Sequence, residues 1–136
     1  EQLEWFENTL KVANMRDYID WIVVFGHHPL YSEHGRSSRI GNKLEDLFIK
    51  YDVDMYIAGH IHHYARLKIN DITYIVSGGG GAELDDQVEI TNPNTRKAFI
   101  TFQYCSVEIE GDHLFFKSYS HNGVLIDKCT LEPRRG

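Results

Sequence analysis

The spacing of apolar residues predicts two amphipathic helices. In both segments apolar residues recur at intervals of three or four, which is the period of a helix that buries one face. The first helix is predicted over residues 2–14, and the second over residues 39–51 with Ser37 or Ser38 as its N-cap. Their apolar faces consist of Leu3, Phe6, Leu10 and Ala13, and of Ile40, Leu44, Leu47, Phe48 and Tyr51, respectively.

Two short apolar runs predict buried strands on either side of the second helix. Residues 22–25 and 55–58 lack a regular alternation with polar residues, which is typical of strands covered on both faces. The polar residues 30–38 have no apolar period and are predicted to form a loop over the end of the first strand. The order strand, helix, strand indicates an α/β fold.

A hairpin follows the second strand. Residues 65–69 and 72–76 alternate or run apolar around a turn at Asn70 and Asp71. Four consecutive glycines, residues 78–81, end this hairpin, and a polar loop extends to about residue 97. Without a following Lys-Ser/Thr pair the glycines are no Walker A loop. They permit either a flexible turn or a close approach of the backbone to a ligand, and both interpretations stay open.

The last third of the chain is predicted to be a three-stranded meander. Its strands cover residues 99–109, 114–119 and 124–131, and Asn-Gly before the third strand is a hairpin signal. Cys105 and Cys129 fall on the two outer strands. Because the middle strand separates them, we expect no disulfide between them.

Composition excludes several classes of function. The 136 residues, 42% of them hydrophobic, are enough for one domain with a real core. The net charge of -6 and the lack of a large Lys/Arg cluster argue against a nucleic-acid partner. No apolar run approaches the 18 residues of a membrane helix, so no membrane span is predicted.

The candidate chemistry consists of histidines directly after the two buried strands. Gly26-His27-His28-Pro29 follows the first strand, and Gly59-His60-Ile61-His62-His63 follows the second, where Gly59 is expected to allow the turn. Six of the eight histidines lie between residues 27 and 63, whereas His113 and His121 flank predicted turns and are expected to be exposed. Neutral imidazole is a common metal ligand, and open α/β sheets gather their chemistry at strand ends. The sequence therefore predicts a metal site.

The type of metal site follows from its donors. A closed structural zinc site usually includes cysteine at a short spacing, and neither cysteine is near these histidines. A nitrogen-rich set spread over two strand ends suits a hydrolytic site, in which two ions clamp the attacking and leaving oxygens. Such a site also needs bridging carboxylates.

These motifs resemble those of a known family. Gly26-His27-His28-Pro29 and Gly59-His60-Ile61-His62 are similar to the G-H-x-P and G-H-x-H motifs of the calcineurin-like metallophosphoesterases. Within that superfamily, Glu33-His34-Gly35 and residues 77–81 resemble the tartrate-resistant type of purple acid phosphatase, as does the opening Gln2-Leu3-Glu4-Trp5. The resemblance is strong over residues 21–81. It implies a layered α/β/β/α sandwich.

The resemblance implies roles for individual residues. It makes His27 and His60 ligands of one metal ion and His62 a ligand of the other. The complete site would hold two ions, iron paired with iron, zinc or manganese. His34 would be the catalytic residue that contacts the phosphate or helps to protonate the leaving group. His28 and His63 occupy variable positions and are expected to play an outer-shell or surface role, and Tyr64 is expected at the mouth of the pocket.

Other motifs of the family are absent from this sequence. G-D-x-x-Y and G-N-H, which supply aspartates, a tyrosine, an asparagine and a histidine, do not occur, and Gly41-Asn42 is followed by lysine. We therefore expect residues 1–136 to be the C-terminal half of a phosphoesterase domain. The N-terminal half would be its partner, and the isolated chain would be inactive.

The predicted function is binuclear metal-dependent hydrolysis of phosphate monoesters. Two alternatives stay open: a phosphodiesterase or nucleotide pyrophosphatase of the same superfamily, and an inactive metal-binding half domain. The resemblance implies a secreted, lysosomal or vacuolar location, which the composition does not test.

Overall fold

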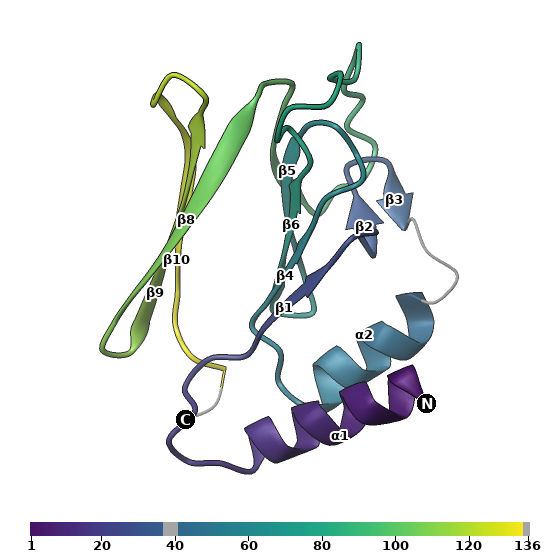
Figure 1. Cartoon of the computed structure of the whole chain (residues 1–136), viewed down its shortest axis with the longest axis vertical. Coiled ribbons are helices and arrows are strands. Elements are labelled where there is room, and N and C mark those ends of the chain that lie inside the picture. The colour runs from purple at the N-terminus through teal and green to yellow at the C-terminus, as the bar shows by residue number, and fades with distance from the viewer. Residues whose placement is uncertain (37–40, 135–136) are drawn as a thin grey trace.

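The computed structural model, which describes residues 1–36 and 41–134, has three layers (Figure 1). Two helices cover one face of a five-stranded sheet, and a three-stranded sheet packs on its other face. The helices are α1 Gln2–Asn14 and α2 Gly41–Lys50. The five-stranded sheet has the order β1 Val23–Gly26, β4 Met55–Ala58, β6 Ile72–Ser77, β5 Tyr64–Ile69 and β7 Thr95–Phe99. The three-stranded sheet contains β10 Leu125–Leu131, β9 His113–Ser120 and β8 Gln103–Glu110, and β2 Tyr31–Ser32 pairs with β3 Gly35–Arg36.

Parallel pairing brings three strand ends to one edge of the five-stranded sheet. β1 pairs with β4, and β4 pairs with β6, both in parallel. Gly26 lies opposite Ala58, which lies opposite Val76. The segments that follow these residues carry both histidine motifs and the glycine run, so the topology places all three side by side.

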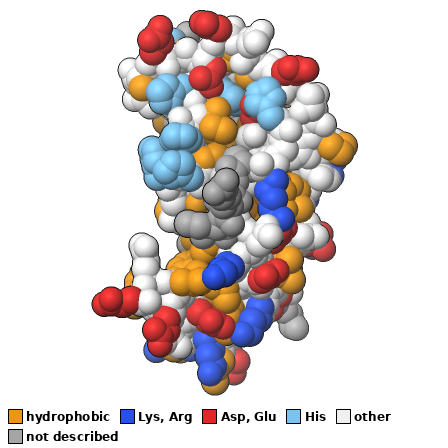
Figure 2. Space-filling model, turned by 90° about the vertical axis from the view of Figure 1, so that its right-hand side faces the viewer, with side chains coloured by type: hydrophobic (Ala, Val, Ile, Leu, Met, Phe, Trp, Pro, Cys, Tyr) orange, Lys and Arg blue, Asp and Glu red, His pale blue; other side chains and the backbone are white. Residues whose placement is uncertain are grey.

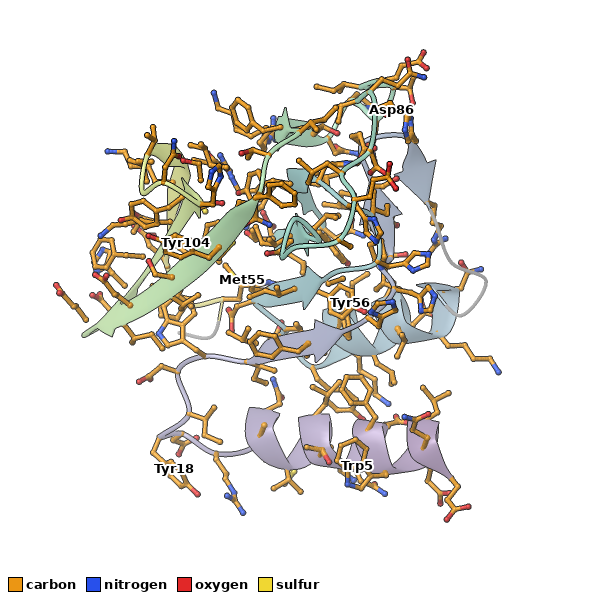
Figure 3. All side chains as sticks on the ribbon, turned by 45° about the horizontal axis from the view of Figure 1, so that its top comes forward. Trp5, Tyr18, Met55, Tyr56, Asp86 and Tyr104 are labelled. Carbon is orange, nitrogen blue, oxygen red and sulfur yellow. The ribbon has the colours of Figure 1, made fainter. Side chains whose placement is uncertain are left out.

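Side chains of the five-stranded sheet alternate between two cores. On β4, Tyr56 packs toward the helices and Met55 packs toward the three-stranded sheet (Figure 3). Phe48 of α2 and Leu10 of α1 belong to the first core, and Phe116 of β9 belongs to the second. This alternation with period two is the physical reason that the sheet can be covered on both faces.

Much of the predicted secondary structure is confirmed. The first helix, the strand at 55–58, the hairpin and the order of the meander agree with the structure. The turn residues Asn70 and Asp71 both have positive φ, as a tight hairpin turn requires. Cys105 and Cys129 are free cysteines. The α/β class is confirmed, whereas the proposed N-cap at Ser37 or Ser38 and the face residue Ile40 lie outside the described residues.

Three predictions about strands were wrong. β1 is not covered on both faces, because nothing in the described structure packs over the end of the strand, where Phe25 is 72% exposed and Gly26 is also exposed. The predicted loop at 30–38 contains the short strands β2 and β3. The predicted strand at 99–109 begins only at residue 103, as β8 of the smaller sheet, whereas residue 99 ends β7 of the larger sheet, which begins inside the predicted loop at residue 95. Residues 100–102 between them carry the chain from one sheet to the other.

Candidate metal centre

The backbone of the first histidine motif is fixed to β4. The amide of Gly59 donates a hydrogen bond of 3.1 Å to the carbonyl oxygen of His27. The Tyr56 hydroxyl donates one of 2.8 Å to the carbonyl oxygen of His28. Pro29 further restricts His28 to extended backbone conformations. Both histidines therefore hold defined positions at the strand end.

Two glycines allow the backbone segments at this edge to approach closely. A Cβ at Gly78 would lie 1.7 Å from the carbonyl oxygen of Ile61, inside the histidine loop. A Cβ at Gly26 would lie 2.1 Å from the Tyr56 hydroxyl. At Gly78 the backbone therefore approaches the histidine loop itself, and neither a flexible turn nor an approach to a ligand is tested by this contact.

Three histidines form an exposed cluster at the ends of β1 and β4. His27, His28 and His60 each offer a ring nitrogen, and these atoms all lie within 4.8 Å of one another. His60 Nδ1 and His27 Nε2 are 3.3 Å apart. Figure 2 shows histidine side chains gathered on the upper part of one face, with acidic side chains above them. We refer to His27, His28 and His60 as the three-histidine cluster.

The turn into this cluster is made by His60. We expected Gly59 to supply it, but His60 is the residue with positive φ, at 65°. Histidine is among the side chains that adopt this conformation more readily than most. Such backbone strain is concentrated at functional sites, where surrounding contacts hold it in place.

The surroundings of His60 favour its neutral form. Desolvation lowers its pKa, and the proximity of His28, His27 and His62 lowers it further. A metal ligand must be the neutral imidazole, so the electrostatics of the cluster agree with metal binding.

His62 does not share the three-histidine cluster in this structure. Its Nδ1 lies 2.6 Å from the carbonyl oxygen of Glu83. Because a carbonyl oxygen only accepts hydrogen bonds, Nδ1 carries the proton, and neutral His62 keeps a lone pair on Nε2.

Behind the cluster lies a buried group of charges that the sequence did not reveal. His63 is 2% exposed and Glu33 is 0% exposed. His63 Nε2 lies 3.0 Å from Glu33 Oε2, and its Nδ1 lies 2.6 Å from Asp85 Oδ2. We call Glu33, His63 and Asp85 the buried ion cluster. His63 was expected to have an outer-shell or surface role, and its burial excludes the surface role.

His63 makes two different contacts in the buried ion cluster: its Nδ1 is hydrogen-bonded to Asp85 Oδ2, whereas its contact with Glu33 is electrostatic. The Nε2 and Oε2 atoms are at ion-pair distance but are not aligned as a hydrogen bond. Burial lowers the pKa of His63, but Glu33 and Asp85 outweigh it, so the pKa is raised. Burial raises the pKa of Glu33, but the contacts with His63 and His34 outweigh it, so the pKa is lowered. Both shifts favour the ionised pair.

The buried ion cluster reaches the predicted catalytic residue. His34 Nε2 lies 3.2 Å from Glu33 Oε1, and the His34 side chain is 54% exposed. The carbonyl oxygen of Glu33 accepts hydrogen bonds from the amides of Thr91 and Asn92, at 2.9 and 2.7 Å. Glu33 therefore ties the loop that carries His34 to the segment before β7.

The expected place of Tyr64 at the mouth of the pocket was wrong. Tyr64 is 0% exposed, and its hydroxyl donates a hydrogen bond of 2.7 Å to Asp127 Oδ2 between the two sheets. Burial, followed by the contact with Asp127, raises its pKa. As the first residue of β5, Tyr64 points into the second core, away from the histidine loop.

Comparisons with known proteins relate this chain to one family. The family model of the calcineurin-like phosphoesterases matches residues 1–64, which include both histidine motifs. The match supports the family that the two motifs indicate. Tartrate-resistant acid phosphatase type 5 of Oryctolagus cuniculus is 37% identical over 82 residues, which are 58% of this chain and 24% of that protein. Fe(3+)-Zn(2+) purple acid phosphatase 12 of Arabidopsis thaliana is 33% identical over 91 residues, 63% of this chain and 19% of that protein.

Solved structures show that this chain shares its fold with proteins of different roles. Purple acid phosphatase PPD1 from yellow lupin (Lupinus luteus) matches with a TM-score of 0.84 and 23% identity, over 97% of this chain and 28% of that one. GAP50, described as the anchor in the inner membrane complex of Plasmodium, matches with a TM-score of 0.87 and 24% identity, over 97% of this chain and 42% of that one. The fold alone therefore does not decide the function.

The chain spans about a fifth to a quarter of the length of these two curated relatives. Within the part of the chain that the structure describes, no helix combines the length and apolar character needed to cross a membrane.

Proposed function

We propose that this chain is part of a binuclear metallophosphoesterase that hydrolyses phosphate monoesters. One observation carries the proposal: His27 and His60 place ring nitrogens 3.3 Å apart at the ends of adjacent parallel strands. The acid phosphatases among its relatives support the reaction type. In a tetrahedral site with metal–nitrogen bonds of 2.0–2.1 Å, two ligand nitrogens are about 3.3 Å apart, so the pair fits one ion.

His62 is proposed as a ligand of the second ion. The hydrogen bond from its Nδ1 to the Glu83 carbonyl leaves Nε2 as the ligand atom. Metal-bound histidines commonly donate their other ring proton to a carbonyl or carboxylate, which fixes the tautomer and the orientation of the ring. Iron or zinc suits these nitrogen donors, and both are named in the description of the Arabidopsis relative.

His34 is proposed to protonate the leaving group. When bound, the two ions would supply a hydroxide nucleophile at neutral pH and neutralise charge on the phosphate. His34 is exposed enough to reach a substrate, and its contact with Glu33 limits the orientations of its ring. A protonated imidazole can donate the proton that the departing alkoxide needs.

The N-terminal half of the domain is proposed to bind beside β1. β1 is an edge strand of the described sheet, and an open parallel edge is a site for pairing with a further strand. A groove of about 560 Å³ lies between α1 and this edge, and its lining includes Trp5, Phe25 and Leu44. Trp5 is 64% exposed and points outward from α1 (Figure 3). A further strand and helix would cover these side chains and would bring the missing carboxylates.

Co-expression with the segment that precedes this chain in its parent protein tests the proposal. The assay is hydrolysis of p-nitrophenyl phosphate, measured for the chain alone, for the complex, and for complexes that carry His60→Ala or the exposed control His121→Ala. Only the complexes with intact His60 should hydrolyse the ester. Equal activity of the His60→Ala complex would contradict the proposal.

The same complex distinguishes the alternatives. Preference for bis(p-nitrophenyl) phosphate over the monoester would identify a phosphodiesterase. Full metal occupancy without hydrolysis of either ester would identify a metal-binding module that is not an enzyme, and the proposed function would be wrong.

A further inference from the structure

We propose that His28 is a metal ligand, and that His27, His28 and His60 together bind one divalent transition-metal ion through three imidazoles. This inference rests on the proposed function, because it concerns the first of the two ions. The inference gives His28 a direct role in metal binding. The family motif leaves this position variable, and the sequence predicted only an outer-shell or surface role for it.

The rings of the three-histidine cluster are arranged as a triangle. The centroid of His28 lies 4.3 Å from that of His60 and 4.9 Å from that of His27, and the third side is 5.2 Å. His27 and His28 meet edge to face, at 89°. One ring nitrogen of each histidine lies within 4.8 Å of a ring nitrogen of each of the other two. All three rings thus offer nitrogen to one small volume.

The local backbone explains why two consecutive residues face the same volume. In a continuing strand, His27 and His28 would point to opposite faces. β1 ends at Gly26, however, and both residues lie beyond it. The carbonyl oxygens of His27 and His28 accept hydrogen bonds from Gly59 and Tyr56, respectively. Tyr56 belongs to β4 and Gly59 follows it, so β4 and its end hold the backbone of the two histidines in place. The strand therefore ends just before His27, and both side chains can turn to the same side.

The donor set fits a first-row transition metal. All three donors are imidazoles, the ligands that suit zinc, iron, copper and nickel, whereas magnesium and calcium prefer oxygen. All three side chains are exposed, so an ion can enter and a water molecule or an oxygen of the substrate can occupy a fourth position. Three protein ligands with one open position are characteristic of catalytic rather than structural zinc sites.

Direct detection of metal–nitrogen bonds tests the assignment of His28. The 136-residue chain, labelled with an NMR-active nitrogen isotope, is freed of metal by chelation and titrated with an NMR-active cadmium isotope. Scalar coupling between cadmium and a ring nitrogen appears only where the two are bonded. We expect coupling to one nitrogen each of His27, His28 and His60 at one equivalent of cadmium.

Zinc affinity, measured by calorimetry, is the second measurement. His28→Phe keeps a flat ring but removes the nitrogen atoms, and we expect it to weaken zinc binding at least about tenfold, as His27→Ala and His60→Ala do. The exposed His121→Ala is the matched control and should bind zinc like the unaltered chain.

The outcomes separate this inference from the proposed function. Coupling to His27 and His60 but not to His28, with normal zinc affinity of His28→Phe, would overturn the inference and leave the proposed function standing. Absence of coupling to all three residues, with no effect of any variant, would overturn both.

Discussion

The buried ion cluster is expected to contribute more to stability than any exposed ion pair of the chain. In Glu33→Gln a buried carboxylate becomes an uncharged amide of nearly the same shape. His63, which is 2% exposed, then keeps only the half-exposed Asp85 as a charged partner. Removal of one partner from a buried ion pair costs about 3 to 5 kcal/mol. Because a domain of this size has a total stability of about 5 to 15 kcal/mol, such a loss is a large fraction of it.

The structure also predicts an order among variants. Asp85 is 40% exposed, so water screens its charge, and Asp85→Asn should cost only about 0 to 1 kcal/mol. His63→Gln leaves Glu33 buried without its main partner and should cost as much as Glu33→Gln. In the double variant both charges are gone, so its loss should be smaller than the sum of the two single losses by about 0.5 to 3 kcal/mol.

The same cluster predicts a window of maximal stability with pH. The pKa of His63 is raised, so its contribution is complete below its ordinary value of 6.5 and is lost as pH rises through the raised value. The pKa of Glu33 is lowered, so its contribution is complete above its ordinary value of 4.5 and is lost as pH falls through the lowered value. Both contributions are present together between pH 4.5 and 6.5.

Thermal unfolding of the metal-free chain, followed by tryptophan fluorescence at several pH values, checks these expectations. Glu33→Gln should lower the midpoint by about 10 °C or more near pH 5.5, and His63→Gln should flatten the pH dependence. A loss below about 1 kcal/mol for Glu33→Gln, or full additivity in the double variant, would refute the reasoning. His121→Gln, at an exposed position, is the control.

Three further predictions concern the metal site and the edge of the sheet. His60→Gly should make the metal-free chain about 1 kcal/mol more stable than His60→Ala in denaturant unfolding, because glycine adopts the positive φ of this position without strain. Metal analysis after dialysis should find one tightly held ion per chain, and His62→Ala should not reduce that number. Two tightly held ions in the unaltered chain would contradict the proposal that the second ion needs ligands from the N-terminal half. Phe25→Lys should weaken binding of the chain to the preceding segment in light scattering, whereas Tyr18→Lys, at an equally exposed residue outside the groove, should not.

Local patterns in the sequence were enough for most of the elements. The helical period of α1 and the alternation around the hairpin depend on neighbours a few residues apart, and both predictions were confirmed. The exposure of β1 could not be predicted in this way. Its apolar run would suit a central strand, and only the order of the sheet makes it an edge. The division of residues 95–110 into β7 and β8 likewise depends on which sheet each half joins.

The distinction between local sequence patterns and long-range contacts also applies to the metal site. His27 and His60 could be proposed from their motifs because each follows a recognisable strand, and parallel pairing then brings them together. Glu33 and Asp85 were missed as partners of His63, because 30 and 22 positions separate them from it in the sequence and no motif relates either of them to His63. The available signal was a carboxylate directly before His34, in a loop without an apolar period.

In the proposed binuclear site, the arrangement of charges favours ligands from outside this chain. Two dications a few ångströms apart require negative ligands between them, and the three-histidine cluster offers only neutral nitrogen. Glu33 and Asp85 both already contact His63, and withdrawal of Glu33 would leave a buried imidazolium with one partner. We therefore propose that the bridging carboxylates come from another segment. β1, whose end carries His27, is also the open edge of the described sheet, so a strand paired there would end beside the cluster. The position that completes the sheet is thus the position from which a carboxylate can complete the site.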